Sequence, residues 1–140
     1  MNISKFTQKS VQAVQDLEKV AYEYGNQEIE QEHLLYTLLT QEDSLILKLI
    51  EKMEINKDYF INVVKKALDA KVKVSGGDLR FGQYLNKSLV NAENEAKAMG
   101  DEYVSVEHLF LSLLTQPSPS MKKIFNEFGI TRERFLQALS

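Results

Sequence analysis

The 140-residue sequence contains no cysteine, and this absence excludes several kinds of chemistry. Without thiols the chain can form no disulfide bond, cannot bind zinc through thiolates and has no cysteine nucleophile. The absence of disulfides also fits a reducing compartment. We therefore expect a cytoplasmic protein.

Long apolar runs and clusters of basic residues are missing as well. No segment approaches the roughly 20 apolar residues of a membrane span, and the N-terminal MNISKFTQKS has no apolar run of signal-peptide length. The formal net charge is −3, and there is no lysine- and arginine-rich run that would neutralise nucleic-acid phosphates. Membranes and nucleic acids are therefore not expected as partners.

The composition is that of a folded protein. Hydrophobic residues make up 44% of the chain and charged residues 26%, a balance typical of soluble globular domains. The length fits one domain, or two small units that share a core. We expect residues 1–140 to fold as one domain.

The chain also repeats itself with an offset of 75 residues. Residues 6–65 align without a gap with residues 81–140, and about a quarter of the pairs are identical, whereas about three or four identities are expected by chance. The strongest block is EHL-x-x-x-LLTQ, which occupies 32–41 and again 107–116. A duplication of this kind predicts two copies of one structural unit.

The first helix of each copy is predicted from its periodicity. Apolar and small residues recur at steps of three and four along 6–24 and along 81–99. Gly25 and Gly100 follow these stripes, at the position where a left-handed C-cap favours glycine. We therefore expect the first helix of each copy to end there.

Three more helices are expected in each copy. The EHL block opens the second helix, with Glu30 in copy 1 and Ser105 in copy 2 at the N-cap position. The third covers about 45–53 and 121–128, and the proline-containing segment 117–119 is expected in the loop before it. The fourth begins near the N-caps Asn56 and Thr131. No stretch alternates with period two, so no sheet is predicted.

A linker separates the two copies. Residues 70–80 lie between repeat 1 (4–69) and repeat 2 (81–140), and Ser-Gly-Gly-Asp at 75–78 is their most flexible part. A repeat that cannot bury its apolar face alone packs against its neighbour. The predicted fold is therefore all-α: two tandem four-helix repeats packed as a pseudo-twofold pair.

The only histidines, His33 and His108, each follow a glutamate in the repeated EHL block. A zinc site would need a further ligand at helical spacing, and neither copy has one. Each histidine is instead expected to fix a helix start by hydrogen bonding. No catalytic triad, phosphate-binding loop or zinc signature occurs, so no catalytic residue and no metal are predicted. Two interpretations stay open for Glu32 and Glu107: they stabilise a helix start through the helix dipole, or they bind a ligand.

Three apolar residues lie off the core stripes. In a helical projection Val11 lies about 100° from the centre of the first stripe, and Tyr84 and Val90 lie about 100° and 140° from the centre of the second. Packing between the copies could cover them. Otherwise they line an apolar groove for an extended or helical peptide.

The repeat, the F-T opening at Phe6 and the motif G-[N/D]-x-x-[I/V]-x-x-E-H-L at 25–34 and 100–109 resemble the N-terminal domain of the Clp unfoldases over essentially the whole chain. Segments 100–105 and 128–133 most resemble the ClpB-type disaggregases, and the adaptor-dependent ClpC type is the alternative. The resemblance implies a Clp N-terminal domain fold.

The resemblance also implies a function. The domain would precede two ATP-driven ring modules in a homohexameric parent and capture unfolded or aggregated polypeptide. The chain has no G-x-x-x-x-G-K-[ST] motif, so ATP and magnesium are expected only in the ring modules, which are missing here. We expect no cofactor in this domain, no enzymatic activity of its own and a monomer when it is isolated.

Specific residues follow from the same resemblance. In ClpB-like domains a threonine and two acidic residues near a groove serve substrate handling, and these match Thr7, Asp101 and Glu107, with Leu89 and its neighbours as the apolar contact. In ClpC-like domains the glutamate of each T-E-H motif receives the guanidinium of a phosphorylated arginine, which would map onto Glu32 and Glu107. The predicted substrate-binding residues are Thr7, Val11, Tyr84, Leu89, Val90, Asp101 and Glu107.

The sequence departs from the ClpC pattern at three positions. Gln31 and Val106 replace the threonines of the two T-E-H motifs, and Gly82 stands where copy 2 would repeat Thr7. Three hypotheses therefore remain: a peptide-binding module of a disaggregase, a phosphoarginine or adaptor receptor, and a structural regulator that docks on the ring of its parent. Because Thr7 and Asp101 have no like partner in the other copy, binding is expected at one asymmetric surface between the copies.

Overall fold

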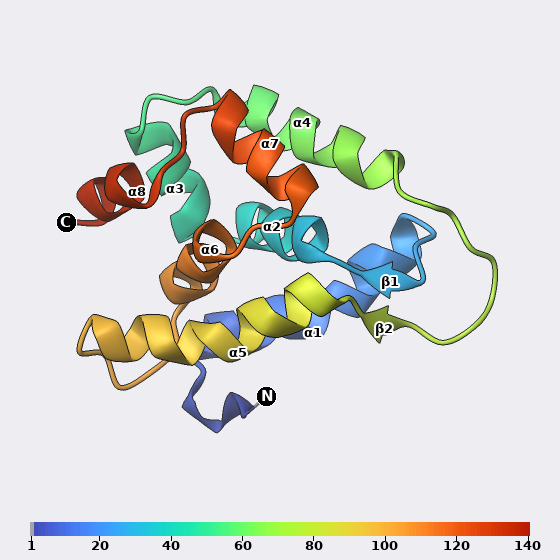
Figure 1. The fold of residues 1–140 in the computed structure, drawn as a ribbon, viewed down its shortest axis with the longest axis horizontal. Helices are drawn as coiled ribbons and strands as arrows, with labels where there is room; N and C mark the ends of the chain where they lie inside the picture. The colour runs from blue at the N-terminus through green and yellow to red at the C-terminus, as the bar shows by residue number, and fades with distance from the viewer. Residues whose placement is uncertain (1) are drawn as a thin grey trace.

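Eight α-helices form most of the computed structural model, which describes residues 2–140 (Figure 1). The predicted all-α fold is confirmed. Within the described residues no helix combines the length and the hydropathy needed to cross a membrane. The elements are η1 (Ile3–Lys5), α1 (Gln8–Glu23), β1 (Glu28–Ile29), α2 (Gln31–Thr40), α3 (Leu45–Lys52), α4 (Lys57–Asp69), β2 (Arg80–Phe81), α5 (Gln83–Ala98), α6 (Val106–Thr115), α7 (Pro119–Glu127) and α8 (Arg132–Leu139).

The helix boundaries follow the local signals. Gly25 and Gly100 adopt φ values of 72° and 73° just after α1 and α5, a left-handed conformation that glycine reaches without steric cost. Asn56 and Thr131 cap α4 and α8, because each side chain accepts a hydrogen bond from a backbone N–H of the first turn. These predicted boundaries are confirmed.

The start of α7 differs from the prediction. We expected the whole segment 117–119 in a loop, but Pro119 is the first residue of α7 and Ser118 is its N-cap. Proline fits this position because the N–H that it lacks would have no partner inside the helix, and its fixed φ is already helical. The prediction was wrong for Pro119.

All eight helices share one core. The two copies of the EHL helix, α2 and α6, lie in the middle of the molecule, between the pair α1 and α5 and the group α3, α4, α7 and α8 (Figure 1). Aromatic rings connect the helices: the centroids of Phe110 on α6 and Phe135 on α8 are 4.5 Å apart, and those of Phe60 on α4 and Phe128 at the end of α7 are 4.9 Å apart. Neither copy therefore encloses a separate core.

Short parallel pairings connect the copies in a crossed arrangement. Strand β1 of copy 1 pairs with β2, which precedes the first helix of copy 2, in the register Glu28–Arg80 and Ile29–Phe81. A single bridge joins Phe6 to Val104, and these two positions are equivalent to Phe81 and Ile29 under the 75-residue offset. Each copy thus pairs the start of its first helix with the start of the second helix of the other copy.

The prediction that the chain has no sheet was wrong in this respect. A two-residue strand is too short to show an alternating pattern, so its sequence carries no strand signal. The pairing comes from the packing of the two copies, which places the extended residues before two helices side by side.

Two polar contacts with buried side chains have no equivalent in the other copy. The Gln31 side chain, 1% exposed, donates to Ser88 Oγ (2.8 Å) and to the Gln116 carbonyl (3.0 Å) and accepts from the Ser118 N–H (2.8 Å). In copy 2 the position of Gln31 is taken by Val106. Gln31 therefore joins α2 of copy 1 to α5 and to the α6–α7 loop of copy 2.

The second contact lies within copy 2. Arg132 of α8 donates two hydrogen bonds, of 2.7 and 2.8 Å, to the buried carboxylate of Glu95 on α5, and Thr115 donates a third of 2.6 Å. The Arg132 hydrogen bond holds the pKa of Glu95 below its usual range. A buried carboxylate needs such partners, because an unpaired charge in the core is strongly destabilising.

Replacing Gln31 with alanine should lower the free energy of unfolding by about 2–3 kcal/mol, because three buried partners lose a hydrogen bond at about 1 kcal/mol each. Urea unfolding followed by circular dichroism measures the change. Gln15→Ala on the exposed face of α1 is the matched control and should change stability by less than about 0.5 kcal/mol. Equal effects of the two substitutions would contradict the assigned role of Gln31.

Candidate functional site

The histidine of copy 1 connects three segments. Glu30 N–H donates to His33 Nδ1 (2.8 Å), so the ring proton lies on Nε2, which is 2.9 Å from the Asn26 side-chain oxygen. The Asn26 amide in turn donates to the Val72 carbonyl in the linker (3.1 Å). The predicted helix-start role of His33 is confirmed, and the same contacts tie the linker to copy 1.

The histidine of copy 2 makes the equivalent contact at the start of α6, but its second ring nitrogen has a different partner. Ser105 N–H donates to His108 Nδ1 (2.8 Å), and His108 Nε2 is 2.8 Å from Asp101 Oδ2. Asp101, whose side chain is 46% exposed, is held in place by this contact. A carboxylate has no proton to donate further, so this chain of contacts stops at the surface.

The two glutamates of the EHL blocks lie in different surroundings. Glu32 is buried, accepts a hydrogen bond from Ser120 Oγ (2.5 Å) and forms an ion pair with Lys71 of the linker (3.3 Å). Glu107 is half-buried and has no ion pair or side-chain hydrogen bond within residues 2–140. The duplicated motif therefore does not form two matching exposed pockets.

The first helices of the two copies also start differently. Thr7 caps α1, because its Oγ1 accepts from Ser10 N–H (3.2 Å). Gly82 has no side chain to cap α5, and a Cβ atom added to it would lie 2.9 Å from Glu28 Oε1. The carboxylate of Glu28 thus occupies the space beside the start of α5, where the helix dipole favours a negative charge.

The predicted apolar residues do not form one surface. Tyr84 and Val90 are exposed, at 45% and 54%, but six helical residues separate them by about 120° around α5. Val11 is half-buried and packs against the core. Leu89 is 1% exposed, so its side chain belongs to the core, and its predicted contact with substrate stays a prediction. The cause is its position on the apolar stripe of α5, which faces α6.

The structure places two of the predicted polar residues near one crossed pairing. Thr7 N–H donates to the Val104 carbonyl (3.0 Å), and Asp101 lines a small cavity of about 140 Å³ with Lys5, Glu102 and Val104. Glu107 does not line this cavity. The predicted Thr7, Asp101 and Glu107 therefore do not share one apolar groove.

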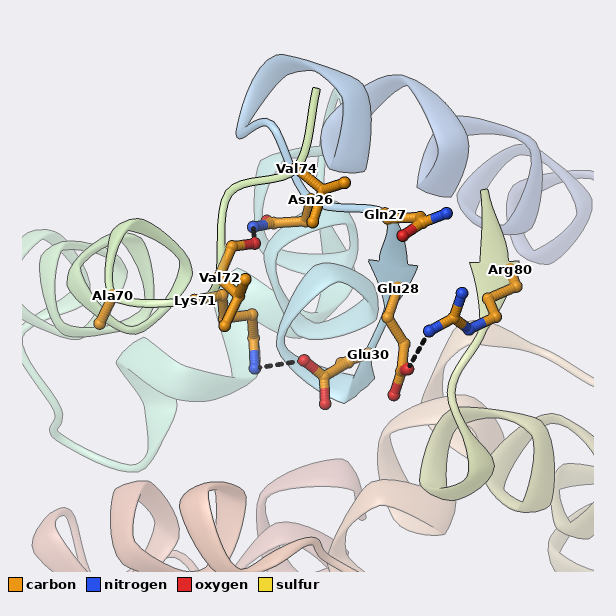
Figure 2. Close-up of a pocket in the computed structure, with 9 residues that line it drawn as sticks. All are labelled: Asn26, Gln27, Glu28, Glu30, Ala70, Lys71, Val72, Val74 and Arg80. Carbon is orange, nitrogen blue, oxygen red and sulfur yellow. Dashed lines mark hydrogen bonds and ion pairs between the residues drawn. The ribbon is translucent and has the colours of Figure 1, made fainter. Parts of the chain in front are cut away.

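A larger cavity lies at the other crossed pairing, and the sequence did not predict it. It has a volume of about 380 Å³ and lies between β1 and the first part of the linker (Figure 2). We call it the linker cavity; it is lined by Asn26, Gln27, Glu28, Glu30, Ala70, Lys71, Val72, Val74 and Arg80. A neighbouring cavity of about 290 Å³ shares Glu28 and Glu30 and reaches Tyr84.

Two ion pairs lie at the linker cavity. Lys71 Nζ is 3.0 Å from Glu30 Oε2, and Arg80 is 3.4 Å from Glu28 Oε2 (Figure 2). Both cations come from the linker region and both anions from the β1 segment. The only sequence signal was that basic residues flank the Gly-Gly pair, and this did not reveal their partners.

These arrangements suit noncovalent contacts. Within residues 2–140 no group of three histidine or acidic side chains could hold a metal ion. Burial lowers the pKa of His33 to about 4, and the nearby Lys71 contributes, so this imidazole is neutral near pH 7. The fold and the cavities define a two-copy helical domain whose surface offers main-chain edges, exposed aromatic residues and paired charges.

Comparison with known proteins places this domain in a family. Residues 5–139 match the family model of the Clp repeat (R) N-terminal domain. The chain belongs to this family, as the resemblance of its repeated motif suggested.

Relatives of the chain include ClpB chaperones. The chain is 37% identical to the chaperone protein ClpB of Nitratidesulfovibrio vulgaris and 39% identical to that of Clostridium tetani, over 99% of its length in both cases. It spans only 17% of the length of each relative.

Solved structures show the same fold. The N-terminal domain of Hsp104 from Candida albicans has a TM-score of 0.83 at 21% identity, covering 98% of this chain and 91% of that one. A ClpV N-domain in complex with a VipB peptide has a TM-score of 0.73 at 20% identity, covering 97% of this chain and 89% of that one.

The stability of the domain should fall as the pH drops from about 6.5 to about 4. The pKa of His33 is lowered to about 4 in the folded state from 6.5 in the unfolded state, so the unfolded chain binds more protons in this window. The contribution is fully present above pH 6.5 and amounts to about 3 kcal/mol. Urea unfolding at pH 7 and pH 4 measures it. His33→Asn removes the titrating group and should flatten the pH dependence by that amount; an unchanged pH profile would refute the assignment.

Proposed function

We propose that this chain is the substrate-binding N-terminal module of an ATP-dependent protein disaggregase and captures unfolded or aggregated polypeptide. ATP hydrolysis belongs to ring modules outside this chain, in a hexameric parent. The domain itself catalyses nothing and acts by noncovalent contact.

The observation that carries this proposal is the match to ClpB N-terminal regions along nearly the whole chain. The surface supports it. Large apolar side chains lie exposed on both flanks of α5, at Tyr84 and Val90, and on the loop before α6, at Tyr103 (53% exposed). Exposed aromatic and branched side chains bind unfolded chains because those chains expose apolar groups of their own.

Titration with a reduced, alkylated and therefore permanently unfolded protein tests the proposal. Fluorescence anisotropy should detect weak binding, in the micromolar range or above, because a hexamer would gain affinity from six copies. Exchanging Tyr84 and Val90 for lysine should weaken binding about thirtyfold, since each loses an apolar contact of about 1 kcal/mol.

The control substitution is Tyr22→Lys, which changes an 81% exposed tyrosine on α1 and should leave the affinity within about twofold. The proposal fails if the unchanged chain shows no binding. Equal losses in both variants would show that the binding is not specific to the α5 flanks.

A second candidate function is favoured by Glu107. Its carboxylate is partly exposed and carries no ion pair within the described residues, so it could receive the guanidinium of a phosphorylated arginine or a basic side chain of an adaptor. Glu32 is less suited, because Lys71 and Ser120 already occupy it.

Calorimetry with free phosphoarginine separates this candidate from the first. It predicts heat with a stoichiometry near one, which Glu107→Ala abolishes and which survives Glu32→Ala as long as that variant folds. Absence of heat rejects phosphoarginine as a ligand and leaves the disaggregase proposal untouched.

A further inference from the structure

Strand β1 has one edge that is not paired. In its ladder with β2, Arg80 N–H donates to the Gln27 carbonyl (3.0 Å) and Gly82 N–H to the Ile29 carbonyl (2.8 Å). Because alternate residues of a strand turn their main-chain groups to opposite sides, the N–H and C=O of Glu28 point away from β2. Neither group makes a hydrogen bond within residues 2–140.

The linker runs beside this free edge but is separated from it by the linker cavity. Val74 N–H donates to the Gly25 carbonyl (2.9 Å), and the Asn26 side chain bridges to the Val72 carbonyl (3.1 Å). In Figure 2 the linker lies on one side of β1 and β2 on the other. The linker cavity of about 380 Å³ separates the free edge from the linker, so the two segments do not pair directly.

The main chain of Glu28 is therefore a donor and an acceptor beside an open cavity. When a ligand strand replaces water as the partner of such groups, each hydrogen bond contributes a net gain of about 1 kcal/mol. The two cations at the rim are already paired, Lys71 with Glu30 and Glu32 and Arg80 with Glu28, so neither is left to bind an anionic ligand. The complementary ligand is another extended main chain.

We propose that the free edge of β1 binds an extended segment of an unfolded polypeptide as an added strand, with Glu28 N–H and C=O as its main-chain partners and the linker as the opposite wall. The proposal rests on the function proposed above and assigns it a place and a binding mode. Strand addition requires an unpaired main chain, which unfolded chains have and folded proteins have largely used. Because the strand offers two residues, the segment is recognised with little sequence preference.

The copies are not equivalent in this respect. Tyr103 occupies the position of Glu28 in copy 2, beside the single bridge of Phe6 and Val104. Within residues 2–140 no segment runs along that edge, since the linker is held against copy 1 by Lys71, Val72 and Val74. The inference therefore concerns the edge of copy 1.

Glu28→Pro tests the inference, because proline removes the N–H that faces the cavity and leaves the ladder with β2 intact. Glu28→Ala is the matched control, which removes the carboxylate but keeps the N–H. With the same reduced and alkylated protein as probe, Glu28→Pro should weaken binding about tenfold and Glu28→Ala by no more than about twofold. Circular dichroism and thermal unfolding verify that both variants fold.

Two further measurements locate the edge. Tyr103→Pro and Tyr103→Ala, at the equivalent position of copy 2, remove the same side chain and should bind the probe equally within about twofold. A loss in Tyr103→Pro beyond that in Tyr103→Ala, as large as the difference between Glu28→Pro and Glu28→Ala, would overturn the assignment to copy 1. Hydrogen exchange of the unchanged chain needs no variant. The Glu28 amide should exchange at least about tenfold more slowly in the presence of the probe, and unaltered exchange would also overturn the inference.

The outcomes separate the two proposals. If the unchanged chain does not bind the probe, the proposed function fails and the inference fails with it. If the unchanged chain binds and Glu28→Pro binds equally well, the free edge is not the site and the proposed function stands. A larger loss in Glu28→Ala than in Glu28→Pro would assign the effect to the carboxylate and contradict main-chain recognition.

Discussion

Main-chain hydrogen bonds join the two copies. In each copy they hold the residues that precede the first helix against the residues that precede the second helix of the other copy. The pairing of β1 with β2 and the bridge from Phe6 to Val104 are the same contact made twice across the pseudo-twofold axis. They fix α1 beside α6 and α5 beside α2, so the EHL helices meet in the centre. A copy taken alone would expose both its apolar stripe and an extended segment without a partner, which explains why the duplication forms one domain.

Symmetry ends where polar side chains replace apolar ones. Gln31 joins the copies at a position where copy 2 has Val106, and the carboxylate of Glu28 fills the space that a side chain at Gly82 would need. Glu32 is enclosed by groups of the linker and of α7, whereas Glu107 stays partly open. These differences occur at the boundary between the copies, because equivalent positions there carry different residues and contact different neighbours. Two sites that look identical in the motif are therefore chemically distinct.

The linker contributes more than a connection. Lys71 reaches Glu30 and Glu32, Lys73 donates to the Tyr24 carbonyl (2.6 Å), and the Val72 carbonyl receives Asn26, so the linker is fastened to copy 1 along its first residues. It forms the outer wall of the cavity beside β1. The binding surface that we infer thus includes the linker as well as copy 1.

The sequence by itself determined the repeat, the helical class, most helix ends and the role of the histidines. These features rest on local chemistry: the stripe of α1, the left-handed Gly25, the cap Asn56 and the bond from Glu30 N–H to His33 all involve residues close together in the chain. The tertiary structure alone decided the crossed ladders, the enclosure of Glu32 and the cavity beside Glu28. Each of these depends on groups about 40 to 100 positions apart, such as Glu32 and Ser120 or Glu28 and Arg80. Helical periodicity shows which face of a helix is apolar, but not which element covers it, and that second fact decides whether a side chain is a core residue or a contact for a ligand.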